Sequence, residues 1–410
     1  MSGPATAPSP FPSPMLRLTD PVGRRGVRGT GMHQSATVLV VGGGISGCAT
    51  AVLLRRSGID VELVEARDSW NTATGSGITL QGNALRALRE VGVWDDVRAW
   101  GCGFDTTGIT TPDGTVLFEE RSVRAGGDDL PATFGTERPR LQQVLAGAVR
   151  ASGARVRTGV RAHVLDQDDD GVRVRLESVD GGAVEEHRYA LVVAADGVGS
   201  RTRAGVGIAD VPEPTGMAVW RVVGPRPAGL DRTDLAYGGP AYIAGYCPTG
   251  ESSMYAYLVT DRDDLPGPDA TLAHVRGLAS AYGGHWPAIT RALTDPAAVN
   301  YSEFSRFVVD GPWHRGRVVL VGDAAHCCPP TLAQGAALGL EDATVLAELL
   351  GGAETWDDTL LGAYAARRAP RVRTVVDASV QLGQWLLDGV RDADVPGLMA
   401  RTMATVRERP

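Results

Sequence analysis

The sequence contains no lysine, so all 40 residues in its Lys plus Arg count are arginines. A chain without lysine has no side-chain amine, which excludes a pyridoxal-phosphate Schiff base, a Walker A phosphate site and other amine-dependent sites. Its five cysteines are odd in number and include no CxxC pair. A disulfide framework is therefore not expected, and a reducing, cytoplasmic location is.

Long apolar runs and excess positive charge are also absent. No run approaches the roughly 18 apolar residues that span a bilayer, so no membrane partner is expected. The net charge of −8 argues against a generally basic protein, so no nucleic-acid partner is expected either. With 410 residues, of which 43% are hydrophobic, the chain can form two or three domains, or one large domain with an insertion.

The first 35 residues differ in composition from the rest of the chain. Residues 1–35 are rich in proline, arginine and glycine and predict a disordered tail. The pair Arg24-Arg25 is not followed by the apolar segment of an export signal. Met32 is an alternative start of translation. The predicted fold therefore begins at residue 36.

A glycine-rich turn follows the first apolar run. Residues 37–41 are apolar and β-branched, as in a strand buried on both faces. Glycines stand at 42, 44 and 47 in the spacing GxGxxG, followed by a helical stretch and a second strand ending at Glu65. The glycines permit a tight turn, close approach of a pyrophosphate, and close packing of the helix. With an acidic residue placed to bind a ribose, this unit predicts a site for NAD or FAD.

Two later segments bear on the choice between NAD and FAD. The apolar run 190–195 leads into residues 196–203, which have the pattern DGxxSxxR. A second apolar run, 317–321, leads into Gly322-Asp323. Each segment alone is a strand followed by a common kind of turn. Together with the glycine-rich turn they form an ordered set of three motifs.

This set resembles the motifs of the FAD-dependent aromatic hydroxylases, the single-component (class A) flavoprotein monooxygenases similar to p-hydroxybenzoate and salicylate hydroxylase. The resemblance covers roughly residues 36–375 and includes segments 75–80 and 364–371. Ala333 departs from the glycine that many members have. The family implies an α/β fold with a Rossmann-type FAD-binding domain, an inserted, mostly antiparallel β-sheet substrate domain, and C-terminal helices.

The resemblance assigns these parts to ranges of the chain. The FAD-binding domain is expected at 36–105, 136–210 and 310–355, the substrate domain at 106–135 and 211–309, and a helical region at 356–410. The implied cofactor-binding residues are Gly42, Gly44, Ser46, Gly47, Glu65, Ala66, Arg67, Arg138, Gln142, Asp196, Gly197, Arg203, Gly322, Asp323, Pro330 and Gly335. Glu65 would bind the adenosine ribose, and Asp323 the ribityl chain. A helix beginning near Gly335 would direct its positive end at the flavin edge that becomes anionic on reduction.

The family's reaction implies NADPH or NADH as co-substrate. Reduced FAD would react with O2 to form a C4a-hydroperoxide, which transfers one oxygen atom to an aromatic, phenolic or polycyclic small molecule. Hydroxylation is expected, with epoxidation and Baeyer–Villiger oxidation as further options, and no metal is expected. An FAD-dependent oxidase or dehydrogenase, or a flavin-binding protein without turnover, stays an alternative. The missing lysine disfavours a halogenase, and the missing second GxGxxG disfavours a two-Rossmann Baeyer–Villiger enzyme.

Between the second and third motifs the chain is aromatic and alternating. Period-two spacing places Tyr242 with Tyr246 on one strand face, and Tyr255 with Tyr257 on one face of another strand. A sheet of this kind over the flavin would form an apolar pocket with a few polar groups. Arg221 is expected to hold an anionic or phenolate substrate, and Tyr242 or Tyr246 to orient a ring hydroxyl. The alternative is that these tyrosines only pack the sheet.

The setting in which the protein acts is also predicted. A composition rich in Arg, Ala, Gly and Val indicates a GC-rich bacterial genome. This favours a role in secondary metabolism or in the degradation of aromatic compounds. The chain is expected to act as a monomer or a homodimer.

Overall fold

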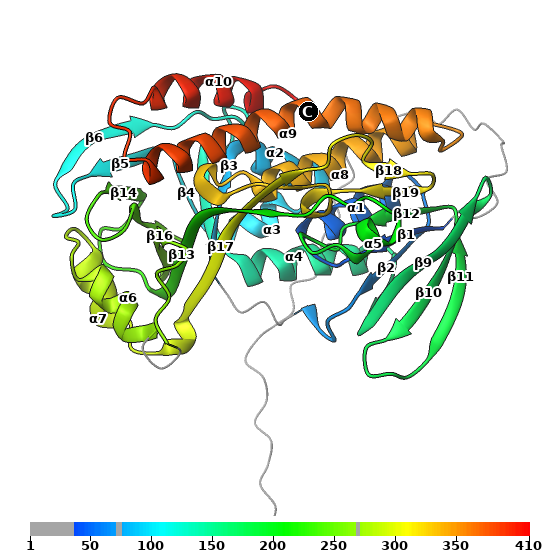
Figure 1. The fold of residues 1–410 in the computed structure, drawn as a ribbon, viewed down its shortest axis with the longest axis horizontal. Coiled ribbons are helices and arrows are strands. Elements are labelled where there is room, and N and C mark those ends of the chain that lie inside the picture. The colour runs from blue at the N-terminus through cyan, green and yellow to red at the C-terminus, as the bar shows by residue number, and fades with distance from the viewer. Residues whose placement is uncertain (1–36, 71–75, 268–270) are drawn as a thin grey trace, which may run out of the picture. The chain divides into compact units, whose positions relative to one another are not determined.

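Helices are interspersed among runs of consecutive strands along the chain, and three helices end it (Figure 1). The computed structural model describes residues 37–70, 76–267 and 271–410, and the predicted tail at 1–35 lies outside the described residues. The strands are β1 Val38–Val41, β2 Val61–Glu65, β3 Gly77–Gln81, β4 Cys102–Phe104, β5 Thr106–Thr110, β6 Val116–Arg121, β7 Thr133–Glu137, β8 Arg155–Thr158, β9 Val160–Asp168, β10 Gly171–Ser178, β11 Val184–Tyr189, β12 Leu191–Ala194, β13 Glu213–Pro225, β14 Thr233–Tyr237, β15 Ile243–Pro248, β16 Ser253–Asp261, β17 Val299–Val308, β18 His314–Arg315, β19 Val318–Leu320 and β20 His326–Cys327. The helices are α1 Ile45–Arg56, α2 Gly82–Val91, α3 Trp94–Arg98, α4 Arg138–Ala151, α5 Arg201–Gly205, α6 Thr271–Ala279, α7 Trp286–Ala292, α8 Gly335–Gly351, α9 Asp358–Leu387 and α10 Val395–Arg407.

A six-stranded, mainly parallel sheet carries all three motifs. Its strand order is β18-β19-β12-β1-β2-β8, and β1 pairs in parallel with both β2 and β12. Along β1, Val38 and Val40 pack against the helices, whereas Leu39 and Val41 pack against the small sheet β9–β11. The predicted strand buried on both faces is therefore confirmed. Because the motifs follow β1, β12 and β19, they meet at the same edge of the sheet.

An eight-stranded sheet forms the second layer, with strand order β20-β17-β13-β16-β15-β14-β5-β6. All its pairings are antiparallel except that of β5 with β14, as predicted for the inserted sheet. One of its faces packs against α6 and α7 through Trp220, Tyr246 and Trp286. The segment 106–135 contributes β5 and β6 to this sheet, but β7 at its end pairs with β3 and β4 instead.

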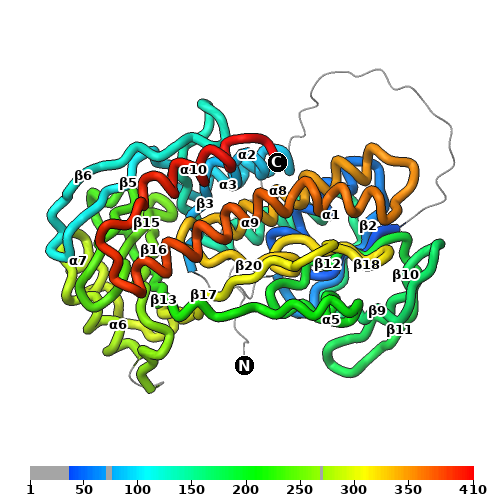
Figure 2. Tube along the Cα trace, turned by 45° about the horizontal axis from the view of Figure 1, so that its top comes forward, coloured from blue at the N-terminus to red at the C-terminus, as the bar shows by residue number. Residues whose placement is uncertain are grey.

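The C-terminal helices pack against the motif-bearing part of the chain. α8 contacts α1 and α2, α9 contacts α8, and α10 lies beside the last turns of α9 (Figures 1 and 2). Between α8 and α9 the fully buried ion pairs of Arg368 with Glu341 and Asp342 hold the two helices together. None of the helices described between residues 37 and 410 has both the length and the apolar character needed to cross a membrane.

Candidate functional site

One cavity of about 1860 Å³ extends from the glycine-rich turn to the inner face of the eight-stranded sheet. Sites for a single small ligand usually enclose about 300–1000 Å³, so this cavity has room for a large cofactor and a second molecule. Of the sequence-predicted cofactor residues, those lining the cavity are Gly42, Gly44, Ser46, Glu65, Ala66, Arg67, Arg138, Gln142, Asp196, Gly197, Asp323, Pro330 and Gly335. The other three predicted residues are buried and do not line the cavity: Gly47, Arg203 and Gly322.

The glycine-rich turn has little room for side chains. Gly42 has a φ of +105°, and a Cβ there would stand 2.4 Å from the carbonyl oxygen of Ala195. A Cβ on Gly47 would stand 1.9 Å from the carbonyl oxygen of Gly42, so this glycine allows α1 to pack closely. At Gly44, by contrast, nothing lies within 4 Å of the Cβ position. Gly42 and Gly47 therefore shape the turn, and Gly44 leaves its inner side open to a ligand.

Glu65 is held in place by backbone donors. Its Oε2 accepts a hydrogen bond from Gly43 N at 2.7 Å, and its Oε1 accepts one from Arg67 N at 2.9 Å. From the opposite side, Gln142 Nε2 donates to the carbonyl oxygen of Gly43 at 2.7 Å. The carboxylate at the end of β2 thus faces the cavity in one orientation. A carboxylate in this position suits the hydroxyl groups of a ribose.

The second motif is internally braced. Asp196 accepts hydrogen bonds from the hydroxyls of Ser200 and Thr202 and from Thr202 N. Arg203 is buried and donates to the carbonyl oxygens of Val198 and Ala324, both at 3.0 Å. Arg203 therefore does not reach the cavity. It joins the second motif to the third through these two carbonyl oxygens.

The third motif surrounds a buried carboxylate. Asp342 in α8 accepts hydrogen bonds from Gly322 N at 2.9 Å, from His326 Nε2 at 2.6 Å and from Arg368 Nε at 2.7 Å. Burial disfavours the charged form of Asp342, but the charges of His326 and Arg368 outweigh this effect and lower its pKa to about 2. His326 is enclosed by Asp342 and the surrounding core, and it does not line the cavity.

Asp323, Cys327 and Cys328 are the titratable groups that the third motif presents to the cavity. The side chain of Asp323 is accessible from the cavity. The protein that surrounds the cavity nevertheless desolvates its carboxyl group and raises the pKa of that group. Burial also raises the pKa of both cysteine thiols to about 12. The thiols are therefore protonated at neutral pH, a form in which they are poor nucleophiles.

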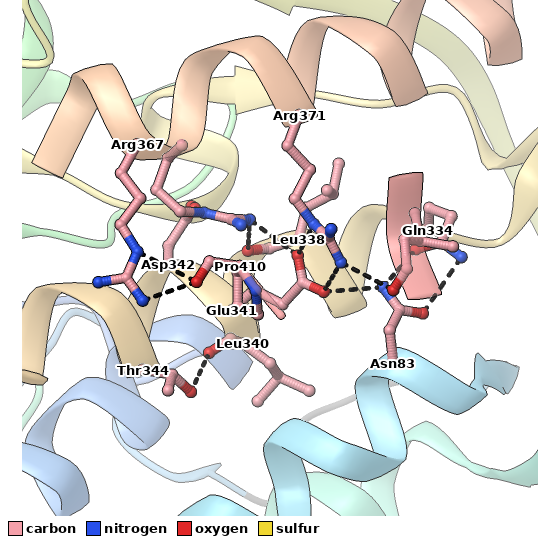
Figure 3. Close-up of polar contacts among 12 residues, drawn as sticks. Asn83, Gln334, Leu338, Leu340, Glu341, Asp342, Thr344, Arg367, Arg371 and Pro410 are labelled. Carbon is pink, nitrogen blue, oxygen red and sulfur yellow. Dashed lines mark hydrogen bonds and ion pairs between the residues drawn. The ribbon is translucent and has the colours of Figure 1, made fainter. Parts of the chain in front are cut away.

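Helix α8 begins at the cavity without a side-chain cap. Gln334 holds the N-cap position, but its side chain pairs with the amide of Asn83, with Asn83 Nδ2 2.9 Å from Gln334 Oε1. Asn83 and Arg371 both donate to Glu341, which lies fully buried beneath this helix end (Figure 3). The first turn of α8 also contains no acidic residue. Its free N–H groups and positive dipole end therefore face the cavity, where they favour an anionic group.

The residues at this end of the cavity fit FAD. At Gly44, Gly197 and Gly199, which all line the cavity, no atom lies within 4 Å of the Cβ position. The helices α1 and α8 both begin there without a side-chain cap or an acidic first turn. An uncapped helix start suits a pyrophosphate, and a second one suits the anionic edge of a reduced flavin.

The other end of the cavity contains Arg221, which pairs with no carboxylate among the described residues. Arg221 in β13 donates from Nη1 to Ser302 Oγ at 2.6 Å. Burial lowers its pKa, and the positive charge of Arg138 adds to this effect, but a guanidinium remains charged in proteins. Among the residues that the structure describes, neither Arg221 nor Arg138 forms an ion pair with a carboxylate. Both line the cavity and attract an anion there.

The tyrosines predicted from the alternating pattern divide between the two faces of the sheet. Tyr255 and Tyr257 share the cavity face, as predicted, with ring centroids 5.5 Å apart. Tyr246 is paired in the β15–β16 register with Ala256, which faces the opposite side, and its hydroxyl donates to Asp234 Oδ2 at 2.9 Å. Tyr246 packs with α7 and does not line the cavity.

Tyr242 does not line the cavity either. It precedes β15, which begins at Ile243, so the alternation assumed for residues 242–246 does not extend to it. Its ring packs against the apolar cluster around Met217 and Val259. This placement gives neither Tyr242 nor Tyr246 access to a ring hydroxyl in the cavity, and of the three predicted substrate residues only Arg221 reaches it.

The C-terminal helices contribute a wall of the cavity that the motifs did not indicate. The side chains from this region that line the cavity are Leu382, Trp385, Leu386, Val390, Ala393, Val395, Pro396, Met399, Ala400, Met403, Ala404 and Arg407. The positions within α10 recur at helical spacing, which is a signal present in the sequence. That signal marks an apolar helix face but not the element that it faces.

Comparisons with known proteins agree with this site. A family model described as "FAD binding domain" matches residues 35–379. YetM of Bacillus subtilis (strain 168), which bears the name of a candidate FAD-dependent monooxygenase, is 32% identical over 90% of this chain and 99% of its own. The aurachin C monooxygenase/isomerase of Stigmatella aurantiaca is 32% identical over 86% of this chain and 91% of its own.

A solved structure has the same arrangement. It is the tetrameric form of 2-methyl-3-hydroxypyridine-5-carboxylic acid oxygenase, which superposes with a TM-score of 0.74 at 25% sequence identity. The match covers 92% of this chain and 97% of the other. The likeness therefore concerns most of the fold.

Proposed function

Because the chain belongs to the FAD-dependent monooxygenases, we propose that it uses NADPH or NADH and O2 to transfer one oxygen atom to an aromatic or phenolic small molecule. The supporting observation is that a single cavity joins the FAD-fitting residues to Arg221 and the tyrosine-lined face of the sheet. When bound, FAD would supply the redox and oxygen chemistry. The side chains of this chain bind, orient and exclude water around it.

Each group of residues has a proposed role at the cofactor. Gly44 and the start of α1 would receive the pyrophosphate, and Glu65 the adenosine ribose. Asp323 would bind the ribityl chain, and Pro330 would border the ring system. The uncapped start of α8 would stabilise negative charge on the ring.

At the substrate end, Arg221 would orient an anionic or phenolate group. No carboxylate in the described part of the chain pairs with its buried charge, and this supports the role because a substrate anion would complete the pair. The solved relative named for a hydroxypyridine carboxylic acid adds support, since a carboxylic acid is anionic at neutral pH. The apolar walls would keep water away from the reaction.

Purified protein tests the proposal directly. We expect a flavin absorption spectrum, and NADPH or NADH oxidation under air that accelerates when phenols or hydroxybenzoates are added. The product should be heavier than the substrate by one oxygen atom, which comes from labelled O2. The proposal would be contradicted if the protein did not bind FAD. It would also be contradicted if no aromatic compound offered increased the rate of NAD(P)H oxidation by the FAD-loaded protein.

The biological setting needs other measurements. The predicted role in secondary metabolism is tested by the genes that neighbour this one. Light scattering during size-exclusion chromatography tests the predicted monomer or homodimer.

A further inference from the structure

One face of helix α10 lines the cavity along its length. The lining positions are Pro396, Met399, Ala400, Met403, Ala404 and Arg407. They follow the spacing i, i+3, i+4, i+7, i+8 and i+11, which is a continuous stripe on one side of an α-helix. At a rise of about 1.5 Å per residue, the stripe is about 16 Å long.

The end of α9 extends this surface. Leu382, Trp385 and Leu386 line the cavity at the spacing of one helix face. With the α10 stripe they form what we call the α9–α10 wall: Leu382, Trp385, Leu386, Pro396, Met399, Ala400, Met403 and Ala404. All eight side chains are apolar, and Arg407 stands at the far end of the stripe. Apolar side chains of the eight-stranded sheet, such as Ile243 and Val259, also line the cavity, and Leu386 packs against their cluster.

Helix α10 is firmly attached on its other side. Thr402 and Val406 are buried against the rest of the protein. Arg86 donates to the carbonyl oxygens of Arg407 and Glu408 at 3.0 and 2.8 Å, and Arg371 donates to that of Val406 at 2.8 Å. These buried arginines satisfy carbonyl groups at the end of the helix. The α9–α10 wall is therefore a built part of the cavity.

The wall remains partly open to solvent. Met399 and Met403 are half-buried, and Ala400 and Ala404 are exposed. Val390 and Val395, which line the cavity between the two helices, are 42% and 41% exposed. Apolar side chains left uncovered inside a cavity favour a ligand that removes them from water. Methionine side chains adapt to apolar ligands of varied shape.

We propose that the α9–α10 wall binds an extended hydrocarbon substituent of the substrate, so that the substrate class is an aromatic acid or phenol with an alkyl chain. The inference rests on the proposed function for the place of the aromatic ring. Arg221 attracts the anionic end, and the wall removes the chain from water. The two features belong to one cavity, so an amphipathic molecule satisfies both.

The test uses 4-alkylbenzoates from ethyl to octyl as probes of the FAD-loaded protein. Isothermal titration calorimetry measures the dissociation constant of each probe, and NAD(P)H oxidation is followed separately. We expect binding to tighten about three- to fourfold for each added methylene, the factor expected for burial of a CH2 group. Affinity that does not change with chain length, as expected if a second copy of this chain covers the wall, would overturn the inference.

Variants locate the effect. The double variant M399Q/M403Q should bind FAD like the wild type but lose at least half of the dependence on chain length. A400F should weaken octylbenzoate binding at least tenfold more than ethylbenzoate binding. R401Q, a change of an exposed residue of α10 that does not line the cavity, should keep the wild-type dependence. If the two wall variants also keep the wild-type dependence of affinity on chain length, the alkyl chain binds elsewhere and the inference is wrong.

The two readouts separate this inference from the proposed function. Chain-length dependence without substrate-stimulated NAD(P)H oxidation would support the hydrocarbon site and contradict the oxygenation. Oxidation of phenols, combined with affinities that do not depend on chain length, would support the oxygenation and contradict the hydrocarbon site.

Discussion

His326 and Asp342 form a contact inside the protein, with His326 Nε2 2.6 Å from Asp342 Oδ2 and both side chains at most 1% exposed. The same Asp342 oxygen accepts the backbone N–H of Gly322, and its other oxygen accepts from Arg368. One carboxylate in α8 thus joins α9 to the turn that presents Asp323 to the cavity. The position of the third motif depends on this buried charge network.

Replacing the central carboxylate should destabilise the fold. In Asp342→Asn the fully buried guanidinium of Arg368 keeps only Glu341 as an anionic partner. We expect the free energy of unfolding at pH 7 to fall by about 3–5 kcal/mol, the usual result of breaking a buried ion pair. Urea denaturation measures it. Asp166→Asn, which breaks an exposed pair with Arg173, should cost less than about 1 kcal/mol; equal losses would contradict the role of the buried network.

The same residue predicts how stability depends on pH. The pKa of Asp342 is lowered from 3.8 to about 2 in the folded protein. A carboxyl whose pKa is depressed by folding stabilises the protein above its unfolded pKa, and this contribution is lost as the pH falls through the folded pKa. We therefore expect stability to decline between about pH 4 and pH 2. Urea titrations across this range should show a shallower decline for Asp342→Asn; an equal slope would assign the acid sensitivity to other groups.

Two glycines of the first motif should respond differently to alanine. Gly47→Ala places a methyl group 1.9 Å from a backbone oxygen and should destabilise the protein. Gly44→Ala meets no protein atom within 4 Å, so its melting temperature without FAD should match the wild type. Its FAD dissociation constant should rise at least tenfold, because the methyl group enters the space assigned to the pyrophosphate. Fluorescence titration with FAD measures the dissociation constant of each variant. An unchanged FAD affinity in Gly44→Ala would show that the pyrophosphate binds elsewhere.

Glu65→Gln should weaken FAD binding. A glutamine is neutral and has one acceptor oxygen in place of two, so it cannot accept hydrogen bonds from Gly43 N, Arg67 N and the ribose hydroxyls of the proposed site together. Hydrogen bonds to a charged group contribute about 1.5–3 kcal/mol, so the FAD dissociation constant should rise about ten- to hundredfold. Glu251→Gln, in an exposed turn, is the control and should bind FAD like the wild type.

Arg221 and Tyr246 should differ in their effect on substrate. Arg221→Met should raise the dissociation constant of benzoate at least tenfold while FAD affinity is kept, because the cavity loses its buried cation. Tyr246→Phe removes a hydrogen bond to Asp234 and should lower the free energy of unfolding by about 1–3 kcal/mol. Its benzoate affinity should equal that of the wild type. If Tyr246→Phe weakened benzoate binding and Arg221→Met did not, the sequence-based prediction that Tyr246 orients a ring hydroxyl would be supported instead.

The cofactor end of the site was readable from the sequence. Gly42, Gly44 and Gly47 mark a turn because only residues without a side chain fit it, and this requirement is local to a few residues. The runs before Asp196 and Asp323 are uniformly apolar because their strands are buried on both faces. The same local rule indicated a parallel sheet, whereas the inserted antiparallel sheet was expected from the family resemblance.

The substrate end was decided by the tertiary structure. Period-two alternation separates the two faces of a strand but does not say which face meets the cofactor, and both faces of this sheet contain tyrosines. The pairing of β15 with β16, together with α6 and α7, assigned Tyr246 to one side and Tyr257 to the other. The spacing of the α10 stripe likewise indicates an apolar helix face but not the element that this face meets. Contacts between Met403 and residues far away in sequence form only when the chain folds. Because the chain has no lysine, the permanent positive charges of the cavity wall are arginines, among them Arg138 and Arg221. The fold placed these two without a paired carboxylate among the described residues.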